Sequence, residues 1–104
     1  MARTTITSPD NRSLTGGADS VFFAARYNWL SITNNDTVPM YARTDGTAPS
    51  STGSEGDYEV PAGETALVPN SAPLWYQGQT DNPGTKLDLA SATATAGYNV
   101  MGVA

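Results

Sequence analysis

The sequence predicts an all-β fold, namely a small antiparallel β-sandwich or β-barrel of seven or eight short strands with an extended N-terminal arm. Short segments that alternate apolar and polar residues recur every ~8–12 residues, and turns rich in glycine and proline separate them. The 104 residues include 10 Gly and 7 Pro, and no long amphipathic helix interrupts this pattern. A chain of this length forms one domain, which buries roughly 60–70% of the surface of its unfolded state.

The first 19 residues are polar and end in the turn sequence Thr15-Gly16-Gly17. They lack a sustained helical period, although the β-prone stretch 4–7 contains one apolar residue, Ile6. We expect residues 1–19 to form an arm and residues 20–104 to form the β-sandwich domain. Two behaviours are open for the arm: it frays as a chain terminus, or it adds a strand to a neighbouring subunit.

Two segments rich in apolar and aromatic residues follow, at residues 21–25 and 26–33. Both are expected to be strands, because aromatic and β-branched residues favour a pleated sheet. A short helix over residues 19–25, with Asp19 as its N-cap, is the alternative for the first segment.

The strand predicted at 26–33 has two distinct faces, because successive side chains of a strand point in opposite directions. Leu30 and Ile32 lie on one face, and Tyr27 and Trp29 lie on the other. We expect Leu30 and Ile32 to face the core. Tyr27 and Trp29 are then exposed, or they pack against something else.

A hairpin with a long connection comes next. Strand 38–44 alternates apolar residues with outward-facing ones, among them Tyr41 and Arg43. Residues 45–56 are nearly all small, polar or turn-forming, so they predict a mobile surface loop. The second strand of the hairpin is expected at residues 57–60.

The remaining strands are predicted at residues 65–68, 74–79, 85–90 and 97–103. Segment 85–90 shows the cleanest period of two, with Leu87 and Leu89 inward and charged residues outward. Trp75 and Tyr76 are adjacent, so one of them must face outward.

The composition argues against an enzyme. The chain has no His and no Cys, which removes the usual general base, the thiol nucleophile and the commonest nitrogen ligand of metals. A hydrolase with paired carboxylates stays formally open, because Glu55, Asp57 and Glu59 would share one face of a strand. We interpret these carboxylates instead as a solvated outer face that discourages aggregation. No metal-binding or phosphate-binding loop pattern is present, so we expect no cofactor.

The charge distribution argues against nucleic acid and anionic membranes as partners. Ten Asp and Glu oppose five Lys and Arg, which gives a net charge of −5, and the basic residues are scattered. The N-terminus lacks the apolar region of a signal peptide, and no run reaches the ~20 apolar residues of a membrane span. We therefore expect a soluble protein that is made in the cytoplasm.

Outward-facing aromatic residues are the main candidates for function. Trp and Tyr on a flat sheet suggest a protein interface or, as in a carbohydrate-binding module, stacking on sugar rings. Packing within the chain's own core is the alternative. With the arm and the hairpin included, the interface candidates are Ile6, Tyr27, Trp29, Tyr41, Arg43, Trp75 and Tyr76.

Several motifs resemble a known group of proteins. The run ITNNDTVPMYARTDGTAP (32–49) leads to DYEVPAGE (57–64), and PLWYQG (73–78) and YNVMGV (98–103) follow. Their order is similar to that in small β-rich structural proteins from the virions of tailed bacteriophages, especially those that infect actinobacteria. The resemblance covers roughly residues 28–103 and consists of strand edges and turns, without a catalytic signature.

The resemblance implies a structural role in a virion, with no catalysis and no cofactor. Proteins of this kind decorate the outside of the capsid or act as minor capsid proteins. They bind the major capsid protein and copies of themselves, typically as homotrimers. A tail protein or an adaptor at the head–tail joint would have a similar sequence. The expected location is the capsid surface of the virion, after synthesis in the host bacterial cytoplasm.

Overall fold

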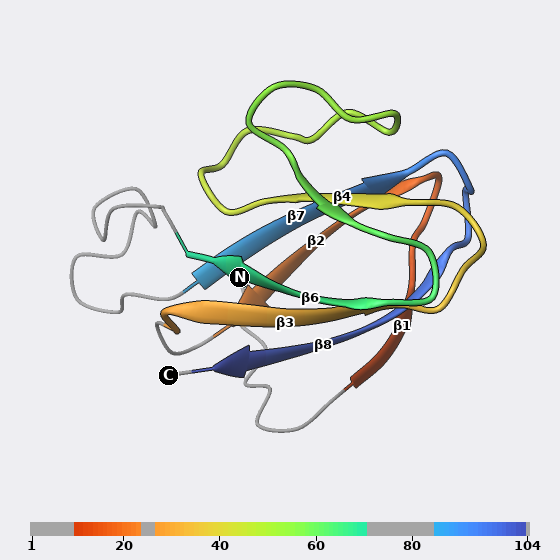
Figure 1. Cartoon of the computed structure of the whole chain (residues 1–104). Helices are drawn as coiled ribbons and strands as arrows, with labels where there is room; N and C mark the ends of the chain where they lie inside the picture. The colour runs from red at the N-terminus through yellow and green to blue at the C-terminus, as the bar shows by residue number, and fades with distance from the viewer. Residues whose placement is uncertain (1–9, 24–26, 71–84, 104) are drawn as a thin grey trace.

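The computed structural model describes residues 10–23, 27–70 and 85–103, and these residues form antiparallel strands without any helix (Figure 1). The eight strands are β1 (Asp10–Ser13), β2 (Ala18–Phe23), β3 (Trp29–Asn34), β4 (Met40–Arg43), β5 (Tyr58–Val60), β6 (Thr65–Pro69), β7 (Thr85–Ser91) and β8 (Gly97–Val103). The prediction of an all-β fold with seven or eight short strands is confirmed. The strand predicted at residues 74–79 lies outside the described residues.

The strands form two four-stranded sheets, with the orders β1-β8-β3-β6 and β2-β7-β4-β5. Every pairing is antiparallel, and every connection except that from β4 to β5 crosses from one sheet to the other (Figure 1). Of the two architectures left open by the sequence, the sandwich is therefore the one observed. This strand order is that of a jelly roll, in which two Greek keys wrap into facing sheets.

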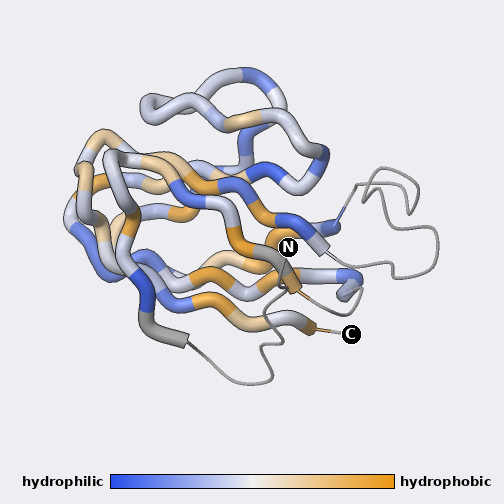
Figure 2. Tube along the Cα trace, turned by 180° about the vertical axis from the view of Figure 1, so that it is seen from behind, coloured by the Kyte–Doolittle hydropathy of each residue, from blue (hydrophilic) through white to orange (hydrophobic). Residues whose placement is uncertain are grey.

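The core lies between the two sheets and is built from alternate residues of each strand. Figure 2 shows the alternation of hydrophobic and hydrophilic positions along the chain. The expected inward residues Leu30, Ile32, Leu87 and Leu89 are fully or almost fully buried. Each such side chain contributes roughly 1.5–3 kcal/mol through burial of apolar surface. The largest buried side chain, that of Tyr98, comes from β8.

The polar N-terminal segment differs from its prediction. From residue 10 onward it belongs to the sandwich: β1 pairs along its whole length with β8, and β2 already begins at Ala18. The helix considered for residues 19–25 is wrong over its described part, since β2 runs through Phe23. β1 is an edge strand that pairs through its backbone, so its pairing requires no apolar alternation in the sequence. Residues 1–9, including Ile6, lie outside the described residues.

Asn34 holds the turn after β3 against the neighbouring sheet. Its side-chain nitrogen donates hydrogen bonds to the carbonyl oxygens of Val38, at 2.8 Å, and Val60, at 3.0 Å. Its side-chain oxygen accepts a hydrogen bond from the backbone N–H of Asp36 at 2.9 Å. A buried amide is stable only with such partners, and here it connects β3, its turn and β5.

Candidate functional site

The β4–β5 loop, residues 44–57, stands above β4 and β7 on the outer side of their sheet (Figure 1). The carboxylate of Asp57 organises it, although the sequence predicts a mobile loop with solvated carboxylates. Asp57 Oδ2 accepts hydrogen bonds from the backbone N–H groups of Ser50 (3.0 Å) and Ser54 (2.9 Å) and from the Ser54 hydroxyl (3.1 Å). The Asp57 side chain is 1% exposed, so its predicted solvation is wrong, whereas Glu55 and Glu59 are exposed as expected.

Arg43 joins the two ends of the loop. Its guanidinium donates to Asp45 through Nη2 (2.6 Å to Oδ2) and Nε (3.1 Å to Oδ1), and to Asp57 through Nη1 (3.2 Å to Oδ1). These hydrogen bonds raise the pKa of Arg43, and the bond from Arg43 lowers the pKa of Asp45 to about 2. Burial works to raise the pKa of Asp57, but the hydrogen bonds from Ser50, Ser54 and Arg43 outweigh it and lower that pKa.

Tyr41 lies beneath the same loop. A Cβ atom added to Gly53 would lie 2.6 Å from Tyr41 Cε1, which shows that the ring packs directly on this glycine. A Cβ atom added to Gly56 would likewise lie 2.7 Å from Nη1 of the Arg43 guanidinium. Tyr41 and Arg43 are both half-buried. The structure therefore places these two interface candidates against the chain's own loop.

The outer face of the other sheet carries an exposed apolar group. Trp29 is 41% exposed and pairs with Pro69 of β6 on one side and with Val103 of β8 on the other. The next outward position, Ser31, pairs with Leu67, which is 56% exposed, and with Met101. We call the group of Trp29, Leu67, Pro69, Met101 and Val103 the outer apolar patch.

The opposite end of this outer face is polar. The hydroxyls of Thr33 and Thr65 are hydrogen-bonded across β3 and β6 at 2.7 Å. The side-chain amide of Asn35 donates to the side-chain oxygen of Asn99. Hence the described residues of this face divide into an apolar end and a polar end.

Tyr27 does not accompany Trp29 at the surface. It precedes β3 and packs against the core, with its ring edge-to-face on Phe23 at a centroid distance of 5.6 Å. A Cβ atom on Gly102 would overlap the Tyr27 ring, so this glycine makes room for it. Of the aromatic candidates in the described residues, Trp29 is thus the most exposed. Trp75 and Tyr76 lie outside them.

Leu67, Met101 and Val103 belong to the patch but were not singled out from the sequence. The signal was present for the last two, because in strand 97–103 the buried residues Tyr98 and Val100 alternate with Asn99, Met101 and Val103. Leu67 sits between an inward Ala66 and an inward Val68. Apolar residues on both faces conceal which face is exposed.

The described residues contain no group of three or more His, Cys, Asp or Glu placed to hold a metal ion. Among them there is also no helix long and apolar enough to cross a membrane. Among the described residues, the outer apolar patch and the side of the second sheet that carries the β4–β5 loop are candidate surfaces for a partner.

No family model, no curated protein and no solved structure matches this chain.

Proposed function

We propose that this chain is a structural protein of a tailed-bacteriophage virion, which binds the outside of the capsid lattice and stabilises it. The jelly-roll strand order supports the proposal, since jelly rolls occur in viral capsid and lectin domains. The motif resemblance found in the sequence points in the same direction. One fold hosts many functions, so the function has to be inferred from the residues at the surface.

The outer apolar patch is the observation that carries it. Exposed contiguous apolar groups with polar surroundings mark protein interfaces, and the energetic centres of interfaces are enriched in Trp. Trp29 lies between Pro69 and Val103, and the polar end of the same face supplies part of a rim. Such an exposed apolar sheet face suits the surface of another protein better than a small substrate.

The proposed partners are the major capsid protein and copies of this chain, assembled as a homotrimer. A capsid surface that repeats the same site many times gives a multivalent binder a high effective concentration. Attachment therefore needs only a modest patch on each copy. No chemical reaction is part of this role.

Carbohydrate binding is a second candidate, and Trp29 is the observation that favours it. An indole ring exposed on a sheet of a jelly roll can stack on the apolar face of a sugar ring. The two candidates differ in what surrounds the ring: sugar sites add hydrogen-bonding side chains, whereas the patch around Trp29 adds aliphatic ones. The second arrangement favours a protein partner.

The test uses a tailed phage whose genome encodes this chain next to a major capsid protein. Its capsids are first stripped of their own copies of the chain, and the purified chain is then added. Wild type is expected to sediment with the capsids. Trp29→Ala is expected to weaken binding about 30-fold or more, as for an interface hot spot worth ~2 kcal/mol. Tyr58→Ala is the matched control, because Tyr58 is 40% exposed but lies in the other sheet.

Equal binding by wild type and Trp29→Ala would exclude the patch as the interface. A gene neighbourhood without phage structural genes would exclude the virion role. Antibody labelling at the tail or at the head–tail joint would replace the decoration role by that of a tail or adaptor protein. Binding on a glycan array that depends on Trp29 would favour the carbohydrate module.

A further inference from the structure

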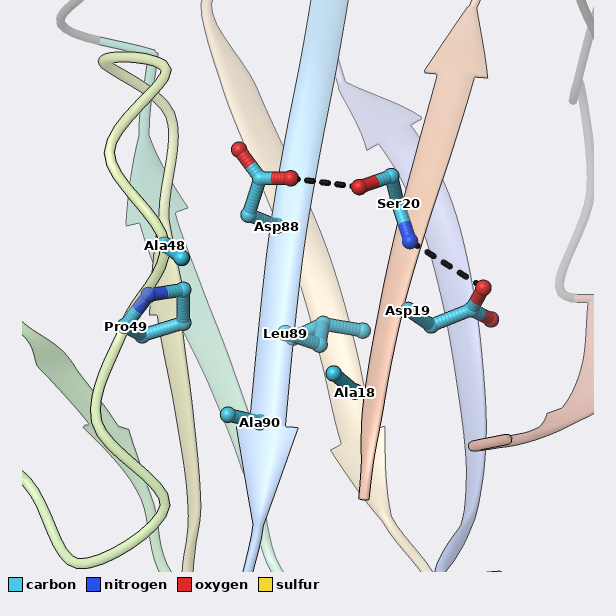
Figure 3. A pocket seen from close by; sticks show the side chains of 8 residues that line it. All are labelled: Ala18, Asp19, Ser20, Ala48, Pro49, Asp88, Leu89 and Ala90. Atoms are coloured by element: carbon cyan, nitrogen blue, oxygen red, sulfur yellow. Dashed lines mark hydrogen bonds between the residues drawn. The ribbon is translucent and has the colours of Figure 1, made fainter. Parts of the chain in front are cut away.

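A pocket of about 350 Å³ opens on the outer face of the second sheet, away from the outer apolar patch. Its base is formed by β2 and β7, and one wall is the β4–β5 loop at Ala48 and Pro49 (Figure 3). A volume in this range is at the small end of sites that hold small ligands. It therefore suits one long side chain or a compact molecule.

Asp88 of β7 lines this pocket and is only 6% exposed. Its Oδ1 accepts a hydrogen bond from the hydroxyl of Ser20 at 2.6 Å and lies 3.7 Å from Lys86 Nζ. Its Oδ2 is buried and has no hydrogen-bond partner among the described residues. In Figure 3 this oxygen points away from Ser20, on the side where the loop residues lie.

An unpaired oxygen on a buried carboxylate is unfavourable, because the group has lost water without gaining a donor. The nearest cross-strand cation does not relieve it. Arg43 is the register partner of Asp88 on β4, but its guanidinium is engaged by Asp45 and Asp57. Lys86 approaches the other oxygen, Oδ1. Asp88 Oδ2 is thus an acceptor that lacks a donor, and a bound molecule could supply one.

The other lining residues indicate which kind of group would carry this donor. Ala18, Ala48, Pro49 and Ala90 give the pocket an aliphatic lining around the carboxylate. Asp19 also lines the pocket, but its carboxylate accepts hydrogen bonds from the backbone N–H of Ser20 and the hydroxyl of Tyr98, so Asp88 supplies the carboxylate of the pocket. The chain as a whole carries a net charge of −5. An aliphatic stem that ends in a cationic donor matches both properties, and this combination is the side chain of lysine or arginine.

We infer that this pocket binds an arginine or lysine side chain of a partner protein. The aliphatic stem packs on the alanines and Pro49, and the head group enters beside the loop and donates a hydrogen bond to Asp88 Oδ2. This inference rests on the proposed function only for the identity of the partner, which would be the capsid protein. It adds a charged contact, on a second face, to the apolar contact made by the outer apolar patch.

The test uses the isolated chain with ¹³C-labelled alanine methyl groups and follows Ala18, Ala48 and Ala90 by NMR. The probes are N-acetylarginine amide, N-acetyllysine amide and the neutral arginine isostere N-acetylcitrulline amide. At least one basic probe is expected to shift the three methyl signals in a saturable way. The citrulline probe should bind at least about tenfold more weakly than the arginine probe. Addition of 0.5 M NaCl should weaken the binding of the basic probe.

Two variants locate the effect. Asp88→Asn keeps the shape of the side chain but removes its charge, and it is expected to weaken the basic probe by about tenfold or more. Asp36→Asn is the matched control, because Asp36 also has a buried unpartnered Oδ2 but does not line the pocket. Ala48→Leu fills the pocket from an exposed position without altering any charge, and it should abolish the shifts of the Ala18 and Ala90 methyl groups even if Asp88→Asn fails to fold.

Equal shifts from the arginine and citrulline probes would overturn the inference, as would unchanged binding to Asp88→Asn or the absence of shifts at about 50 mM probe. Shifts of the same methyl groups by methyl glycosides, without any by the basic probes, would assign the pocket to a sugar instead. This assay needs no capsid, so a negative result would reject the pocket inference without affecting the sedimentation test of Trp29→Ala. Equally, a negative sedimentation result would reject the proposed function without affecting the pocket inference.

Discussion

Tyr98 on β8 donates a hydrogen bond from its phenolic hydroxyl to Oδ2 of Asp19 on β2 and thereby links the two sheets of the sandwich. Tyr98 is fully buried, so its hydroxyl has little access to water. Burial raises the pKa of Tyr98, and the hydrogen bond to Asp19 adds to this effect. The pair thus adds a polar link between the sheets to their apolar packing.

Replacing this hydroxyl should destabilise the fold measurably. Tyr98→Phe leaves the Asp19 oxygen without its donor, at an expected cost of about 1–3 kcal/mol in the free energy of unfolding. Urea denaturation should show a lower midpoint with an unchanged slope. The control is Tyr58→Phe on the exposed edge strand β5, which should stay within about 0.5 kcal/mol of wild type. Equal midpoints for the two variants would show that the link carries no stability.

Stability should fall in acid because of the carboxylates of the β4–β5 loop. The pKa of Asp45 is lowered to about 2 and that of Asp57 is also lowered, so both groups bind protons more weakly in the folded chain than in the unfolded one. Their stabilisation is therefore complete above a pH of roughly 4, and it is lost as the pH falls toward 2.

Urea midpoints measured from pH 7 to pH 2 test this dependence. Asp57→Asn should lower the midpoint at neutral pH and flatten its decrease in acid, because one of the two responsible carboxylates is gone. A decrease in Asp57→Asn as steep as in wild type would assign the acid sensitivity to other groups.

Gly53 should tolerate a side chain less well than Gly63. Both glycines have positive φ, at 85° and 72°, so alanine costs about 1–2 kcal/mol of backbone strain at either position. At Gly53 the new Cβ would also meet the ring of Tyr41, whereas at Gly63 no atom lies within 4 Å. Gly53→Ala should thus lose more stability than Gly63→Ala, and only Gly53→Ala should shift the NMR signals of the Tyr41 ring. Unmoved ring signals in Gly53→Ala would contradict the packing described here.

Truncation of a side chain should destabilise the fold on the inner face of the first sheet but not on its outer face. Ile32→Ala removes a fully buried side chain and should cost about 2–5 kcal/mol. Leu67→Ala, at a position 56% exposed, should change stability by no more than about 0.5 kcal/mol. Thermal unfolding of the isolated chain distinguishes them. A large loss in Leu67→Ala would mean that the patch is structural rather than available to a partner.

The sequence could predict the strands that bury one face, because burial of alternate residues leaves a period of two. This is why Leu30, Ile32, Leu87 and Leu89 were placed correctly in the core. β1 left no such signal, since it pairs through backbone groups at a sheet edge.

The functional surfaces were harder to predict. The role of Asp57 depends on Ser50, Ser54 and Arg43, whose spacing follows no period. Asp88 was expected to face outward, and it does lie on the outer face of its sheet. Its burial was not foreseen, because the wall at Ala48 and Pro49 comes from a loop forty residues earlier in the chain.

The jelly-roll order also determines when the chain can fold. β7 lies between β2 and β4, and β8 lies between β1 and β3, so the last two strands complete the interiors of both sheets. A growing polypeptide that lacks them has no closed sheet to form, and its early strands must wait for partners almost a full chain length away. We therefore expect slow folding, in milliseconds to seconds, in which the second sheet is completed by β7 and the first only after β8 has emerged from the ribosome.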